Sequence, residues 1–176
     1  GVPKSITTEA FVIRQRKLPS KDNIVTLFTH DVGKISVLAK GIKSITSRRL
    51  SHTQTLNLIT VVLRKHHDYW YLNETSLISA FSTIKNDEAK ANLMYLLVYV
   101  LDRLLPDSQQ ELEIYRKTKK FITEIAKSTD DLTGQWSLFL NNLMQVLGYS
   151  QNQKSITELY RIIEELTNEK IPLRII

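Results

Sequence analysis

The chain has 176 residues and a mass of 20.4 kDa, with 42% apolar and 24% charged side chains. These values are ordinary for a globular protein with a buried core and exclude a low-complexity chain. Cysteine is absent, which excludes disulfides, cysteine-ligated zinc and thiol nucleophiles and favours a reducing, cytoplasmic setting. The longest apolar stretch, residues 93–101, has about half of the length that a membrane helix needs, and residues 1–10 lack the hydrophobic region of an export signal. We therefore expect no membrane contact.

The net charge of +6 is unevenly distributed along the chain. Residues 1–85 hold 13 Lys and Arg against five Asp and Glu, a net charge of +8, whereas residues 86–176 hold 11 against 13, a net charge of −2. A basic half is typical of a region that binds a polyanion such as nucleic acid. The alternative is that the basic surface only increases solubility.

The first half has the composition of a β-sheet domain, with short runs of Val, Ile, Thr and Phe between turn residues. Ile35, Val37 and Ala39 recur at every second position and so share one face of a strand. Five or six short strands in about 80 residues predict a small closed barrel. The predicted strands cover residues 10–13, 23–30, 34–42, 56–63 and 69–72, with 77–84 either extending the sheet or crossing to the next domain.

The second half has the period of helices. Helices are predicted at residues 88–105, 108–127 and 133–147, and a fourth opens at the capping box of Ser155 and Glu158. The first of them is apolar on nearly every side, and Gly148 is expected to cap the third. The predicted fold class is therefore α+β, with a β-barrel domain in residues 1–84 followed by an all-helical bundle in residues 85–176.

No motif in the sequence supports catalysis. A Gly-rich phosphate loop, a GxSxG or HExxH motif and an acidic cluster at metal-ligating spacing are all absent. The run His66-His67-Asp68 is the most tempting candidate, but neighbours in an extended segment point to opposite faces, which prevents convergent ligation. We interpret this run as a solvated hairpin tip and expect a protein that is not an enzyme and holds no cofactor or metal.

Basic residues of the first half cluster at predicted loops, where Lys and Arg neutralise phosphates and hydroxyl groups position them. The rings of Tyr69, Trp70 and Tyr71 are candidates for stacking on bases, although alternation along the strand means that some of them face inward, and a core position is at least as good an account of each ring. The predicted nucleic-acid contacts are Arg14, Arg16, Lys17, Lys21, Lys34, Lys40, Lys43, Ser47, Arg48, Arg49, Tyr69 and Tyr71.

Residues 9–49, EAFVIRQRKLPSKDNIVTLFTHDVGKISVLAKGIKSITSRR, resemble the N-terminal domain of RecO-type DNA recombination and repair proteins. The similarity continues in the second half at Phe139, at Leu143 and at the Leu147-Gly148-Tyr149 element, where the family has an F…L…LGY helix end, and in residues 158–174. Within the first half, the positions that match the family pattern are Phe28, Thr29, Gly33, Lys34, Lys40, Gly41, Lys43 and Ser47.

This resemblance implies an OB-fold followed by a helical domain. It also implies binding to single- and double-stranded DNA, strand annealing, docking on the C-terminal tail of single-stranded DNA-binding protein, and recombinase loading with the RecR partner. The chain departs from the pattern where it runs from Tyr149 directly into the last helix, because relatives carry an insertion there, often with zinc-binding cysteines. It also has Ser137-Leu138 where many relatives have Arg, and its IPLRII finish lacks the usual Ser.

The tail of single-stranded DNA-binding protein is acidic and ends in apolar residues, so it needs a hydrophobic pocket bordered by cations. The predicted partner contacts are Arg116, Lys117, Lys119, Lys120 and Phe121. The alternative is a solvated helix face whose cations balance the charges of Glu111, Glu113 and Glu124.

The leading hypothesis is a non-catalytic, DNA-binding recombination mediator of RecO type. Two others stay open: a protein-interaction adaptor built on the barrel, and an RNA-binding OB-fold protein, since phosphate contacts alone do not distinguish the sugars. Binding that weakens steeply with salt separates nucleic-acid binding from the adaptor.

Overall fold

The computed structural model describes residues 4–20, 22–40, 52–129 and 131–172. Its contacts group into two compact units. The first, which we call the barrel unit, is Gly1–Ser82 with Leu104–Leu112, and the second, the helical unit, is Thr83–Arg103 with Glu113–Ile176. The predicted fold class is confirmed, whereas the domain boundary after residue 84 stays a prediction.

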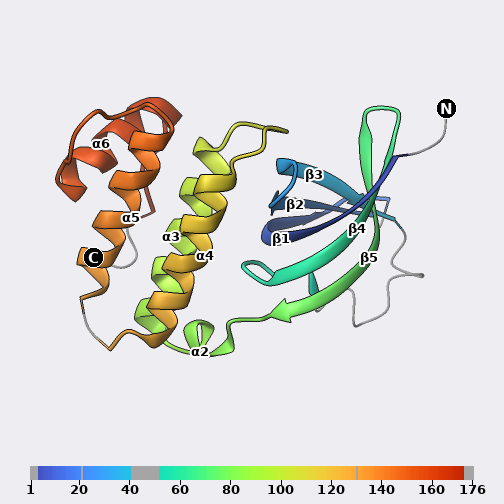
Figure 1. Ribbon diagram of the computed structural model, residues 1–176, viewed down its shortest axis with the longest axis horizontal. Coiled ribbons are helices and arrows are strands. Elements are labelled where there is room, and N and C mark those ends of the chain that lie inside the picture. The colour runs from blue at the N-terminus through green and yellow to red at the C-terminus, as the bar shows by residue number, and fades with distance from the viewer. Residues whose placement is uncertain (1–3, 21, 41–51, 130, 173–176) are drawn as a thin grey trace. The chain divides into compact units, whose positions relative to one another are not determined.

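The barrel unit is a closed five-stranded barrel with the strand order β1-β2-β3-β5-β4 (Figure 1). Neighbouring strands pair antiparallel except β3 and β5, which pair in parallel. A small five-stranded barrel that closes on itself is the architecture of OB-folds. The strands are β1 (Lys4–Lys17), β2 (Asn23–Thr29), β3 (Gly33–Ala39), β4 (Leu58–His66) and β5 (Tyr69–Ser79).

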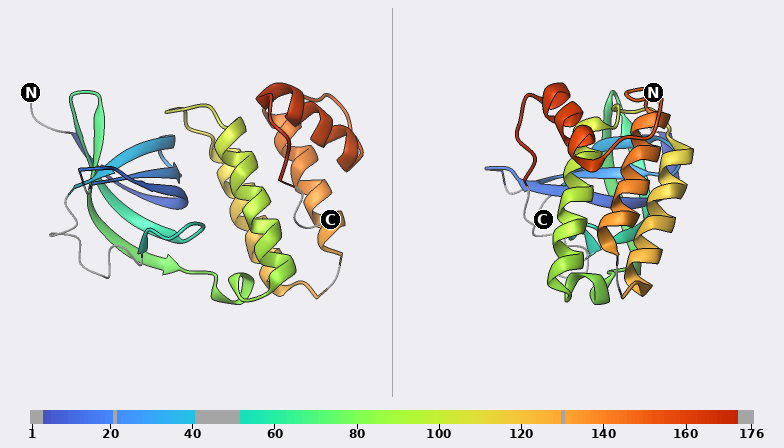
Figure 2. Two further views of the ribbon diagram at one scale, coloured as in Figure 1. Left: turned by 180° about the vertical axis from the view of Figure 1, so that it is seen from behind. Right: turned by 90° about the vertical axis from the view of Figure 1, so that its left-hand side faces the viewer.

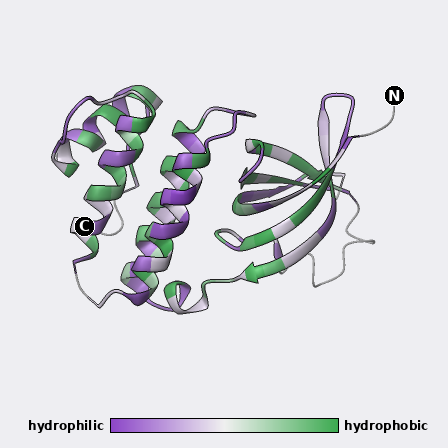
Figure 3. Cartoon of the chain, viewed as in Figure 1, coloured by the Kyte–Doolittle hydropathy of each residue, from purple (hydrophilic) through white to green (hydrophobic). Residues whose placement is uncertain are grey.

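The apolar residues that alternate along the predicted strands fill the interior of the barrel. Val25 and Leu27 of β2 lie in one buried cluster with Ile35, Val37 and Ala39 of β3, so the intervening residues face outward. Apolar segments recur along the strands, and the tip of the hairpin between β4 and β5 is hydrophilic (Figure 3). This tip is the run His66-His67-Asp68, as predicted, with the His67 backbone at φ 54°.

Strand β1 is much longer than the predicted segment 10–13. Its polar end stays paired because Arg14 lies opposite Thr26 and Arg16 opposite Ile24, after a register shift between Val12 and Arg14. That shift is a bulge, which turns both arginines to the outer face. The prediction ended the strand too early because the polarity of this segment reflects exposure and not the end of pairing.

The segment that joins α3 to α4 belongs to the barrel unit. The Ser108 amide donates to the carbonyl oxygen of Lys34 over 2.7 Å, and the Lys34 Nζ atom lies 3.5 Å from an Asp107 carboxylate oxygen. Gly33 has φ +74°, and a Cβ atom there would overlap the backbone carbonyl of Gln109. We call these contacts the clasp. They explain why the predicted helix 108–127 begins only at residue 112.

The helical unit contains α2 (Ser82–Lys85), α3 (Glu88–Leu104), α4 (Leu112–Lys127), α5 (Leu132–Val146) and α6 (Ile156–Thr167). Helices α3, α4 and α5 run roughly along one direction in Figure 2. The Ser155 side chain caps α6 by accepting from the Glu158 amide, and Gly148 follows α5 with φ +83°, both as predicted. Of the helices in the described ranges, none has the length and apolar character needed to cross a membrane.

Candidate nucleic-acid interface

A single row of residues crosses the outer face of the barrel in register. Arg16 of β1 pairs with Ile24 of β2, Ile24 with Leu38 of β3, Leu38 with Tyr71 of β5, and Tyr71 with Arg64 of β4. Adjacent strands lie about 4.8 Å apart, so each of these five side chains is a close neighbour of the next one as the row passes around the barrel. We call them the outer row. It has an arginine at each end and three half-buried apolar or aromatic residues between them.

Lys40, directly after β3, and Arg64 of β4 approach the aromatic residue of this row. Lys40 Nζ lies 5.4 Å from the centre of the Tyr71 ring, and the Arg64 guanidinium carbon lies 5.3 Å from it. Because β5 lies between β3 and β4 in the sheet, the two cations reach the ring from strands on opposite sides. Both distances are within the range of a cation–π attraction.

Alternation separates the three aromatic residues that open β5. Trp70 packs against the core of the barrel, while Tyr71 faces outward between Leu38 and Arg64. Tyr69, on the same face as Tyr71, is 69% exposed. The structure thus places the two tyrosines predicted as stacking residues on the outside of the barrel and leaves the tryptophan inside.

The other predicted contacts divide into three groups. Arg14, Arg16 and Lys17 are exposed on β1, and Lys40 is exposed at the end of β3, next to the outer row. Lys34 lies elsewhere: it is only 8% exposed and pairs with Asp107 in the clasp, so its ammonium group is committed to a structural contact. The remaining predicted contacts, Lys21, Lys43, Ser47, Arg48 and Arg49, lie outside the described residues.

The sequence interpretation missed Arg64, which it placed in a polar turn. In the structure β4 continues to His66, and Arg64 keeps the outward phase of the strand, opposite Tyr71. Val61 and Leu63 face inward, two residues apart, and continuing this alternation by one residue places Arg64 on the outside. Within the described ranges, no three His, Asp or Glu side chains come together as a metal site would require.

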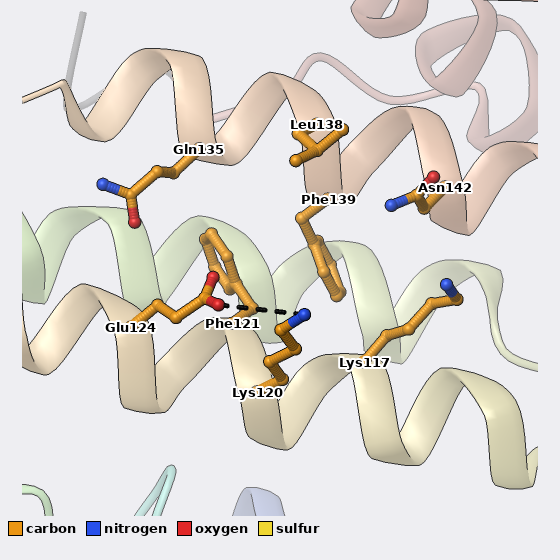
Figure 4. Close-up of a pocket in the computed structure, with 8 residues that line it drawn as sticks. All are labelled: Lys117, Lys120, Phe121, Glu124, Gln135, Leu138, Phe139 and Asn142. Atoms are coloured by element: carbon orange, nitrogen blue, oxygen red, sulfur yellow. Dashed lines mark ion pairs between the residues drawn. The ribbon is translucent and has the colours of Figure 1, made fainter.

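A second candidate site is a hollow of about 120 Å³ between α4 and α5 (Figure 4). Its apolar part includes Phe121 and Phe139, whose stacked rings have centres 4.7 Å apart, and Leu138, which is 58% exposed. Lys117 and Lys120 border it, so three of the five predicted partner contacts lie together. Arg116 and Lys119 do not line it.

Both lysines at the hollow have acidic neighbours one turn away. Lys117 lies 3.9 Å from a Glu113 carboxylate oxygen, and Lys120 lies 4.0 Å from one of Glu124, the pair that Figure 4 marks by a dashed line. Such exposed pairs contribute little to stability, so both lysines can turn to another anion at small cost. The hollow therefore combines an apolar floor with available positive charge.

A known protein family matches the barrel. The family model described as "Recombination protein O N terminal" matches residues 4–81, which contain all five strands. The barrel is therefore similar to the N-terminal domain of RecO-type proteins. The resemblance predicted from residues 9–49 is thus confirmed.

Relatives extend this similarity into the helical unit. A "DNA repair protein RecO" of Caldanaerobacter subterraneus subsp. tengcongensis is 28% identical over 148 residues, which are 82% of this chain and 58% of that protein. Proteins of the same name from Thermoanaerobacter sp. and Clostridium kluyveri are 26% and 27% identical to this chain. Each alignment covers 82% of this chain, and it covers 58% of the first protein and 56% of the second. The chain thus spans less than two thirds of the length of these RecO relatives.

Proposed function

We propose that this chain is a non-catalytic DNA-binding protein of DNA repair and recombination. Its barrel binds single- and double-stranded DNA on the outer row and the neighbouring cations Arg14, Lys17 and Lys40. The observation that carries this proposal is the in-register outer row, with an arginine at each end and an aromatic ring flanked by cations. The names of the relatives support the biological setting, since they are DNA repair proteins.

The chemistry of this face suits a nucleic acid. Lys and Arg neutralise phosphates and release their counterions, which supplies affinity that is independent of sequence. Apolar and aromatic side chains between those cations offer contact area to sugars and bases. Strand annealing and recombinase loading with RecR belong to the same proposal and rest on the resemblance to RecO-type proteins.

The first test is a titration of labelled single-stranded DNA, duplex DNA and RNA at several salt concentrations. We expect DNA affinity to fall steeply with salt because phosphate contacts release counterions. Replacing Lys40, Lys43, Arg48 and Arg49 with Ala should weaken binding similarly for all sequences and flatten the salt dependence. Absence of DNA binding at low salt would favour the adaptor, and tighter binding to RNA would favour the RNA-binding alternative.

We further propose that the hollow between α4 and α5 binds the acidic, apolar-ended tail of single-stranded DNA-binding protein. Phe121, Leu138 and Phe139 would contact the apolar end, and Lys117 and Lys120 the acidic residues. The Ser137-Leu138 sequence replaces the arginine of many relatives, so positive charge at this site comes from α4.

A matched pair of variants on one helix tests this partner site. A peptide that copies the tail should bind in the micromolar range and lose about tenfold in affinity when Lys117→Glu and Lys120→Glu are combined. Combining Arg116→Glu and Lys119→Glu makes the same change in net charge outside the hollow and should have a much smaller effect. Equal losses in the two variants would show that the peptide senses only the overall charge of α4.

A further inference from the structure

The outer row has more apolar character than phosphate contacts require. Ile24, Leu38 and Tyr71 occupy adjacent strands and are all half-buried, with charge only at the ends of the row. Contacts with phosphates alone would gain nothing from these three side chains, because phosphate oxygens need donors and cations. Their presence indicates a ligand with flat apolar surfaces and charges beside them.

Tyr71 is the residue of the row whose chemistry is most specific. The ring faces away from the barrel core, and its neighbours across the two strand pairs are Leu38 and Arg64. Lys40 and Arg64 both lie within 5.4 Å of the ring centre. A base that stacks on this ring takes the place of a cation over it, and these long, flexible side chains can then turn to the flanking phosphates. Single-strand-binding surfaces combine stacking with charge in this way.

We infer that Tyr71 is a base-stacking residue through which the barrel prefers unpaired DNA. The inference rests on the proposed DNA-binding function and assigns its strand preference to one side chain. In a duplex, each base is stacked between its neighbours and paired, so its face is not available to the ring. An unpaired strand can present a base face to Tyr71 while its phosphates contact Lys40 and Arg64.

The test uses the full chain and three DNA ligands of equal length: an ordinary single strand, a single strand with abasic sites in place of its bases, and a duplex. The wild-type protein should bind the ordinary strand about tenfold more tightly than the abasic strand, because stacking on an aromatic ring typically contributes that much per base. Tyr71→Ala should remove this difference and change the affinities for the abasic strand and the duplex by less than about twofold.

Two substitutions at the same position separate stacking from other effects. Tyr71→Phe keeps the ring and should bind like the wild type, whereas Tyr71→Leu keeps apolar area without a π face and should resemble Tyr71→Ala. Tyr149→Ala removes an exposed ring of the helical unit and should leave all three affinities unchanged. If Tyr71→Ala does not fold, Tyr71→Leu, which keeps the apolar area, tests the same loss of the aromatic ring.

The outcomes distinguish the inference from the function on which it rests. Equal wild-type affinity for ordinary and abasic strands, or equal losses for all three ligands in Tyr71→Ala, would overturn the stacking role and leave DNA binding standing. No binding to any of the three ligands at low salt would overturn both.

Discussion

The barrel face and the hollow between α4 and α5 both combine cations with aromatic rings, but in different ways. On the barrel, Lys40 and Arg64 lie over the outward ring of Tyr71. At the hollow, the rings of Phe121 and Phe139 are buried and stack on each other, while the lysines pair with acids of their own helix. The first surface offers charge and ring to one ligand, as an unpaired nucleic acid requires. The second offers an apolar floor with a charged rim, as an acidic peptide requires.

The largest expected effect is a difference in stability between substitutions at two glycines, one in each unit, that both have positive φ. Gly33→Ala should lower the free energy of unfolding by about 3–5 kcal/mol, because the new Cβ overlaps the Gln109 carbonyl of the clasp. Gly148→Ala has the same unfavourable φ but no atom within 4 Å of its Cβ, so it should cost only about 1–2 kcal/mol. Denaturant unfolding of both variants measures the difference. Equal costs would mean that the close approach at Gly33 is absent in solution.

The second effect concerns the packing of the helical unit. The Asn141 side chain is fully buried, donates to the Lys154 carbonyl oxygen over 3.0 Å and accepts from the Lys154 amide over 2.9 Å. Asn141→Ala should lower the free energy of unfolding by about 2 kcal/mol, because the partly buried backbone groups of Lys154 lose their partner. Asn142→Ala, at the rim of the hollow, should change stability by less than about 0.5 kcal/mol. Thermal or denaturant unfolding checks both values, and a reversed order would contradict this account.

The smallest effect is a dependence of stability on pH. Hydrogen bonds from Tyr99 and Arg103 lower the pKa of Glu169 in the folded protein. A carboxyl group with a lowered folded pKa stabilises the protein above its unfolded pKa, and this contribution is lost as the pH falls through the folded value. Glu169→Gln should therefore lower the melting temperature near pH 7, and the difference from the wild type should shrink below about pH 4. A difference that stays constant with pH would exclude this ionic contribution.

The sequence predicted those features that depend on local periodicity. Ile35, Val37 and Ala39 line the barrel core, and Ser155 caps α6, because a period of two or a capping box is determined by neighbours in the chain. The late start of α4 could not be predicted, since residues 107 and 108 are held by Lys34, far away in the sequence. The outer row also escaped prediction. Periodicity indicates which residues face outward, but only the strand register brings Arg16, Leu38 and Arg64 into one line.

The central claim is that DNA binds to the outer face of the barrel, and the salt dependence of binding by two matched variants tests it most directly. Arg16→Ala combined with Arg64→Ala removes both charged ends of the outer row, and Lys127→Ala combined with Arg161→Ala removes two exposed cations of the helical unit. We expect the first pair to weaken single-strand binding and to flatten the slope of log affinity against log salt by about 1.4, the value for two lost phosphate contacts. The second pair should leave the slope unchanged. Equal slopes for both variants and the wild type would contradict the claim.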